Sequence, residues 1–201
     1  MGEAALVNFG TPWTYAGFTD SHSDSGRIGL RFERGPWQMS GAYFETYVND
    51  INAVLPSNGN RGALSDLESK GWDTSVAYNW ASGFVRLNYT RADVKLNNAT
   101  IGSTAYYLSR PLGDILTLES AWQIDDQWGL GSSAEVAFDK NDAALSLPGY
   151  EVVNLYATYR PRTMENLELR LDARNIFDKT YASRSSDGID SVRVIPLNEP
   201  G

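Results

Sequence analysis

The chain has 201 residues, an acidic composition with a formal net charge of −8, and no cysteine. The negative charge disfavours a nucleic-acid partner, and the lack of cysteine excludes disulfides, thiolate metal ligands and cysteine nucleophiles. No run of about 18 apolar residues occurs, so no membrane-spanning helix is expected, whereas the strands of a membrane barrel are short and only half apolar.

Residues 1–25 are rich in Gly, Ser, Thr, Asp and Tyr and show no clear period, so we expect a loop or partial strand. The first residues lack the basic and apolar regions of a secretory signal, so a protein located beyond the inner membrane would begin differently. Residues 26–33 then alternate between apolar and charged side chains, which predicts a strand with two unlike faces. A turn at 35–36 leads to a second strand at 37–49, whose facing stays open because aromatic residues lie on both sides.

Further alternating segments follow at 69–80, 85–90, 116–124, 128–138, 153–160 and 167–174. In the last segment every second residue is apolar and every intervening one is charged: Leu167, Leu169, Leu171 and Ala173 oppose Glu168, Arg170, Asp172 and Arg174. The count is about eight strands, and no segment shows a helical period.

The connections between these strands alternate in length. Short turns are expected at 35–36, 81–83, 125–126 and 161–166, and long loops at 50–68, 97–113, 139–149 and 178–201. Short turns at one end and long loops at the other are typical of an outer-membrane barrel. Four of the six tryptophans lie within about three residues of a short turn, as an interfacial girdle requires: Trp37, Trp80, Trp122 and Trp128. We therefore predict an antiparallel transmembrane β-barrel, with a soluble all-β fold as the alternative.

Eight strands could close on themselves as a small barrel. Against that, the chain finishes on a loop-like run at 198–201 and has no terminal strand that ends in an aromatic residue. The faces predicted to point inward also carry many charges, among them Arg86, Glu119, Glu135 and Arg160. A wide lumen accommodates such charges more easily than a tight interior.

Four segments together resemble the C-terminal end of the TonB-dependent outer-membrane receptors. They are LPGYEVVNL at 147–155, LELRLDARNIFDKTY at 167–181, KGWD at 70–73 and NYTRAD at 88–93. The resemblance covers 26–201 and implies a bacterial outer-membrane location and part of a 22-stranded barrel. It implies a fragment with about eight of the last nine strands, lacking the plug domain and the last strand. The implied partners are membrane lipid, the TonB complex through the missing N-terminal part, and an iron complex; the complete barrel would be monomeric.

Within that family, segments 102–113 and 181–188 most resemble the haem and haemoglobin receptors. The resemblance therefore implies TonB-dependent uptake of an iron complex, with haem as the first expectation and a ferric siderophore as the alternative. Haem or siderophore would be the transported ligand, and no resident cofactor is expected. A small outer-membrane barrel with an adhesive or structural role, and a soluble lipocalin-like binder, are the other hypotheses.

Four residues are candidates for ligand binding: His22, Tyr106, Tyr107 and Arg110. The single histidine could contact haem iron, the tyrosines could offer an aromatic contact, and the arginine could meet a propionate. Solvated loop residues and loop packing are the simpler interpretation of all four. The carboxylates at 125–126 and 139–142 suit turns better than calcium ligation. The chain has no Gly-x-Ser-x-Gly elbow, phosphate loop or His/Cys cluster, so no enzyme is expected.

Overall fold

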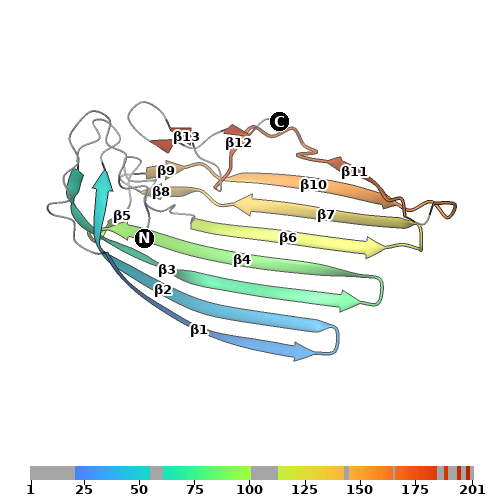
Figure 1. Cartoon of the computed structure of the whole chain (residues 1–201), viewed down its shortest axis with the longest axis horizontal. Helices are drawn as coiled ribbons and strands as arrows, with labels where there is room; N and C mark the ends of the chain where they lie inside the picture. Colours follow the sequence, from blue (N-terminus) through green and yellow to red (C-terminus); the bar gives the residue numbers. More distant parts are fainter. Residues whose placement is uncertain are drawn as a thin grey trace.

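The structure is a computed structural model, and it describes residues 21–54, 61–100, 113–142, 145–164, 166–184, 188–189, 194–195 and 198–199. One antiparallel sheet dominates it, with the strand order β1-β2-β3-β4-β6-β7-β10-β11 and with β5 paired to β4 (Figure 1). Its strands are β1 (His22–Arg34), β2 (Trp37–Val54), β3 (Arg61–Trp80), β4 (Gly83–Leu96), β5 (Ala99–Thr100), β6 (Gly113–Gln123), β7 (Trp128–Ala137), β10 (Tyr150–Tyr159) and β11 (Leu169–Ala173). The prediction of an all-β antiparallel sheet is confirmed.

In the described part of the chain, three small sheets of two short strands each accompany this sheet. The six strands are β8 (Lys140–Asp142), β9 (Leu145–Leu147), β12 (Tyr181–Ala182), β13 (Gly188–Ile189), β14 (Val194–Ile195) and β15 (Asn198–Glu199). Figure 1 shows the short turns gathered at one end of the sheet, on the right, and β5, β8, β9 and β13 at the other. We call these the turn end and the loop end. Within the described residues, no helix is long and apolar enough to cross a membrane.

The register of the ladders gives the sheet two unlike faces. Residues directly opposite each other across paired strands project to the same side. One such row crosses six strands and is apolar: Met39, Val76, Leu87, Leu118, Ala134 and Val153. The adjacent row, one residue along each strand, projects to the other side and is largely polar: Ser40, Ser75, Asn88, Thr117, Glu135 and Val152. We call these the apolar face and the polar face.

The ladder also settles the facing of the second strand. Tyr43 is paired with Ile28 on one side and Trp72 on the other, so Trp37, Met39, Tyr43 and Tyr47 all belong to the apolar face. Phe44 is the aromatic residue that points the other way. Its ring lies 2.8 Å from where a Cβ of Gly71 would stand, so the glycine leaves room for it on the polar face.

The burial pattern is the reverse of a soluble sheet. Large apolar side chains remain exposed, with Leu30 at 86%, Leu171 at 74% and Trp72 at 54%. The buried apolar residues of the main sheet are small or β-branched and lie on the polar face, as Ala77 and Ala137 do. A soluble sheet would place its leucines in a core, so this apolar face requires a non-aqueous environment.

The predicted loops are too long in four places. Residues 50–54 and 61–68 extend the β2–β3 hairpin, Ala99–Thr100 forms β5, 139–149 contains β8 and β9, and 178–201 contains β12 to β15. The β2–β3 ladder shifts register twice, between Val48 and Ile51 and between Asn52 and Val54. Such irregularities break the period of two that reveals a strand in a sequence, so this extension was not visible. The predicted loop or partial strand at 1–25 is strand from His22, and residues 1–20 lie outside the described part.

The motif at 175–179 ends β11 halfway along its neighbour. Asn175 and Asp178 adopt positive φ values of 47° and 52°. The Asn175 side chain accepts the amide of Lys179 at 3.0 Å and donates to its carbonyl at 2.8 Å, which closes a tight turn. Its backbone amide donates to the Asn154 side chain of β10 at 2.8 Å. Asparagine tolerates this left-handed conformation better than most residues, so the sequence Asn-Ile-Phe-Asp-Lys is suited to interrupt the strand.

Candidate functional site

The polar face is the candidate functional surface, and hydrogen bonds run across its strands. The Ser75 hydroxyl donates to Asn88 Oδ1 at 2.8 Å, and Asn88 Nδ2 donates to Thr117 Oγ1 at 3.1 Å. Two strands further on, Asn154 Nδ2 donates to Ser133 Oγ at 3.1 Å. Short polar side chains opposite each other can satisfy one another's hydrogen-bonding groups in this way. The face is therefore a hydrogen-bonded surface that can also be in contact with water.

A hollow of about 500 Å³ lies on the polar face towards β1, lined among others by Arg27, Ser40, Asp73 and Asn88. Arg27 Nη2 stands 3.3 Å from Asp73 Oδ2, and Thr90 Oγ1 donates to Asp73 Oδ1 at 3.2 Å. A second hollow of about 330 Å³ also opens on this face. Small residues of this face such as Ala77 and Ala137 are also buried, whereas large residues of the apolar face stay exposed, as expected when the polar face is the concave side of a curved sheet.

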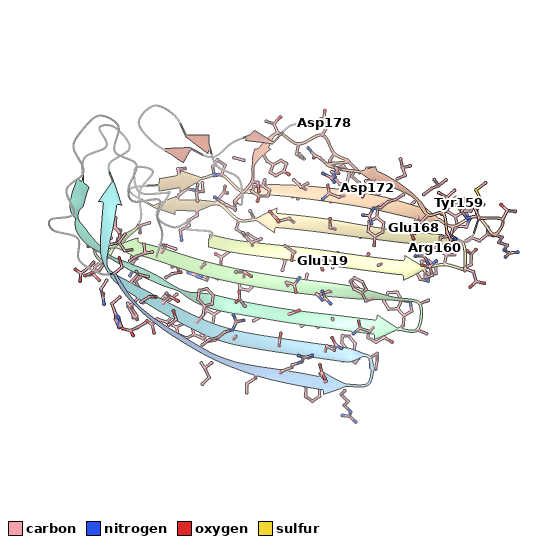
Figure 2. All side chains as sticks on the ribbon, in the orientation of Figure 1. Glu119, Tyr159, Arg160, Glu168, Asp172 and Asp178 are labelled. Carbon is pink, nitrogen blue, oxygen red and sulfur yellow. The ribbon has the colours of Figure 1, made fainter. Side chains whose placement is uncertain are left out.

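Paired charges gather on the polar face near the turn end. Figure 2 shows Arg160 and Glu168 together there, and Arg160 Nη2 lies 2.6 Å from Glu168 Oε2. Arg170 pairs with Asp172 at 2.8 Å, and its guanidinium lies 4.0 Å from the centre of the Tyr156 ring. These charges were predicted to face a lumen, and the structure balances them in pairs on the concave side.

Two aromatic levels limit the apolar face. Towards the turn end, the Trp37 ring lies 4.9 Å from Tyr78, and that of Trp128 lies 4.5 Å from Tyr159. Towards the loop end, Tyr43 and Trp72 are 4.9 Å apart. Trp72 and Trp80 mark the two levels on β3 (Arg61–Trp80), roughly 26 Å apart along the strand at about 3.3 Å per residue. A strand tilt of about 35–45° reduces this to roughly 20 Å across the membrane, somewhat less than the ~25 Å apolar band of an outer-membrane barrel.

Beyond the aromatic level at the loop end, the apolar face carries charged side chains. Lys70 Nζ lies 2.6 Å from Glu68 Oε1, and this hydrogen bond raises the pKa of Lys70. Arg91 lies 3.5 Å from Asp93, whose carboxylate also meets Lys140 at 2.6 Å. The apolar face therefore has a defined end, as a surface that passes from hydrocarbon into a headgroup region needs.

His22 is the one predicted ligand-binding residue within the described part of the chain. It lies at the start of β1 with 73% of its side chain exposed, and its Nε2 stands 3.3 Å from Asp24 Oδ1. Tyr106, Tyr107 and Arg110 lie outside the described residues. No group of three or more metal-type ligands occurs among the residues described. His22 lies on an exposed strand end, and its role in ligand binding stays a prediction.

The family model described as TonB dependent receptor-like, beta-barrel matches residues 7–176. The chain belongs to the TonB-dependent receptor family. Receptors of this family are bacterial outer-membrane proteins that act as transporters and not as enzymes. For the TonB-dependent receptor barrel, the apolar convex face is the lipid face and the polar concave face is the lumen side.

Curated relatives include the heme transporter BhuA of Brucella abortus, 25% identical over 193 residues, which covers 87% of this chain and 28% of the relative. Among solved structures, the FrpB iron transporter from Neisseria meningitidis superposes with a TM-score of 0.68 at 15% identity, over 82% of this chain and 28% of that one. The ferric-catecholate import receptor Fiu from E. coli K12 gives 0.64 at 22% identity, over 98% and 29%. The chain thus spans less than a third of the receptors it matches.

Two features of the structure could not be predicted from the sequence. Arg27 and Asp73 come together from β1 and β3, and their pairing depends on a register that no local pattern fixes. Arg184 stands in a loop-like run and is buried to 3% exposure. Neither has a local signal, although the charge of Arg27 on the polar face was predicted from alternation.

Proposed function

We propose that the chain is the C-terminal part of the barrel wall of an outer-membrane receptor that imports haem by a TonB-dependent route. The observation that carries the transport role is the two-faced wall, apolar and exposed on its convex side and polar on its concave side. Such a wall separates lipid from a water-filled or plugged lumen.

The choice of haem rests on the relatives and on two segments. The BhuA heme transporters align over most of this chain at 25% identity. Segments 102–113 and 181–188 resemble haem receptors. In this proposal the loop end captures haem, and import needs a plug and the TonB complex, which act through parts of the receptor other than this wall.

Ferric siderophore import is the second candidate. It is favoured by the superposition with Fiu, a ferric-catecholate import receptor, over 98% of this chain. The barrel wall is shared by both kinds of receptor, so the two candidates differ in the loops at the mouth. A small barrel formed by this chain alone is the third candidate. It would need the sheet to close with its polar face inside.

The reading frame that contains these residues tests the transport proposal first. A plug-coding region upstream and a strand ending in Phe downstream support it, whereas a stop codon with no barrel upstream would overturn it. The full-length receptor in detergent is then titrated with haem and followed by the Soret band. Saturable binding supports haem as the ligand. If the Soret band does not change and the receptor binds a ferric catecholate instead, a siderophore is the ligand.

We also propose His22, Tyr106, Tyr107 and Arg110 as ligand contacts. For His22 the test is His22→Ala in the full-length receptor, with Arg34→Ala, exposed at the turn end of the same strand, as the control. Haem affinity and the position of the Soret band should change only in the histidine variant. Identical titrations of the two variants would remove His22 from the site.

A further inference from the structure

Arg184 is the buried charged residue of the described part of the chain, at 3% exposure. It follows β12 (Tyr181–Ala182), in the segment that continues beyond the end of β11 along the edge of β10. A guanidinium out of water loses its hydration, and an apolar side chain would fill the same space at lower cost. The contacts of Arg184 must therefore offset the cost of burying its charge.

The Arg184 side chain bridges the two feet of an excursion from the sheet. Residues 138–149 leave β7, form the β8–β9 hairpin and return to β10. Arg184 Nη2 donates to the carbonyl of Phe138 at 2.8 Å and to that of Leu147 at 3.1 Å. Phe138 stands at the outgoing foot and Leu147 near the returning foot. One planar guanidinium thus holds both ends of the excursion, which a flexible lysine ammonium does less well.

Tyr150 fixes the segment that carries Arg184. The Arg184 backbone amide donates to the Tyr150 hydroxyl at 3.0 Å, and that hydroxyl donates to the Glu135 carboxylate. The Tyr150 and Tyr181 rings lie 4.7 Å apart. The contacts of Arg184 span 34 to 46 residues of sequence and join the segment after β11 to the residue that follows β7, to β9 and to β10.

Two further contacts hold the base of the same excursion. Asp139 Oδ1 accepts the Gly149 amide at 2.6 Å, directly between the two feet. Lys140 Nζ meets Asp93 of β4 at 2.6 Å, and only 14% of the Lys140 side chain is exposed. The base of this loop is therefore ordered by buried and paired groups, although it lies at the loop end of the wall.

We propose that Arg184 is a positioning residue that holds the base of the 138–149 excursion and thereby fixes this side of the ligand entrance. The role rests on the proposed function, because an import receptor needs ordered loops at the end where ligand arrives. Ordering the loop before binding lowers the entropic cost of capturing ligand. Loss of Arg184 should loosen the base first and weaken ligand binding as a consequence.

The test uses the full-length receptor in detergent, with Arg184→Ala, the conservative Arg184→Lys, and Arg162→Ala as matched control. Arg162 is exposed on the turn-end connection between β10 and β11, far from the excursion. Trypsin cleavage after Lys140 is timed by mass spectrometry, and heat-modifiable gel migration reports whether the barrel is folded. We expect cleavage about tenfold faster in Arg184→Ala, an intermediate rate in Arg184→Lys, and no change in the control.

A Lys140 cleavage rate within about twofold of wild type, in a folded Arg184→Ala barrel, would overturn the proposal. If that variant does not fold, Tyr150→Phe removes the hydroxyl that accepts the Arg184 amide, and unchanged cleavage there overturns it equally. Haem affinity should fall in parallel with faster cleavage; faster cleavage with unchanged affinity would remove the entrance role. If wild type binds no haem, the proposed function fails, while Lys140 cleavage still decides what Arg184 does.

Discussion

The two faces of this sheet are built from alternate residues of the same strands, yet they follow opposite rules. On the apolar face, large side chains such as Leu30 and Leu171 stay exposed. On the polar face, Asn88 is hydrogen-bonded on both sides, to Ser75 and Thr117. Each face is therefore matched to its own solvent. The apolar face is stabilised by what surrounds the protein, and the polar face by contacts within the wall and with water.

An arginine introduced in the middle of each face should give the largest difference in stability between the two faces. In the full-length receptor folded in lipid vesicles, Leu118→Arg is expected to lower the free energy of unfolding by about 2–4 kcal/mol, because it places a charge in hydrocarbon. The neighbouring Thr117→Arg faces the lumen side and should cost about 1 kcal/mol or less, mainly the lost bond from Asn88. Urea unfolding followed by tryptophan fluorescence measures both. Equal costs would contradict the assignment of the faces.

Substitution of a glycine on the polar face should give the next largest loss of stability. The ring of Tyr156 lies over Gly131, and a Cβ there would stand 2.1 Å from the ring. Gly131→Ala should therefore push the ring aside and disturb its stacking with Arg170, at a cost of about 1–3 kcal/mol in the same unfolding assay. Gly26→Ala is the matched control, since a Cβ at Gly26 meets nothing within 4 Å. If the two alanines cost the same, the ring does not rest on Gly131.

The hydrogen-bonded row of Ser75, Asn88 and Thr117 on the polar face should contribute less to stability. Asn88→Ala removes one bond to Ser75 and one to Thr117, and should cost about 0.5–1.5 kcal/mol because water replaces part of both. A double-mutant cycle with Ser75→Ala isolates the contact between Asn88 and Ser75, with an expected coupling of at least ~0.5 kcal/mol. Strict additivity of the two variants would mean that water alone satisfies these side chains, and that the row is not a stabilising contact.

The two faces could be predicted from the sequence because alternation is local. Leu169 and Leu171 oppose Arg170 and Asp172 by spacing alone, and the short turns show which strands are neighbours. Register could not be predicted where it shifts, as between Val48 and Ile51 in the β2–β3 hairpin. Arg184 was equally invisible, because nothing near it in sequence indicates that carbonyls 37 and 46 residues away need a donor. Of the proposed ligand contacts, only His22 could be placed.

Asp125, in the turn between β6 and β7, should give the smallest change in stability. Asp125 Oδ1 accepts the amides of Trp128 at 2.8 Å and Gln127 at 2.7 Å, and these bonds lower the pKa of Asp125 below its ordinary value of 3.8. A lowered pKa in the folded state means that the ionised carboxylate stabilises the fold above the ordinary value, and that this contribution disappears as the pH falls through the lowered one. The stability difference between wild type and Asp125→Asn should therefore be constant at neutral pH and shrink only in acid. Asp126→Asn, one residue along the same turn, is the control. A difference that stays constant down to the lowest pH would show that the amide bonds, and not the charge, stabilise this turn.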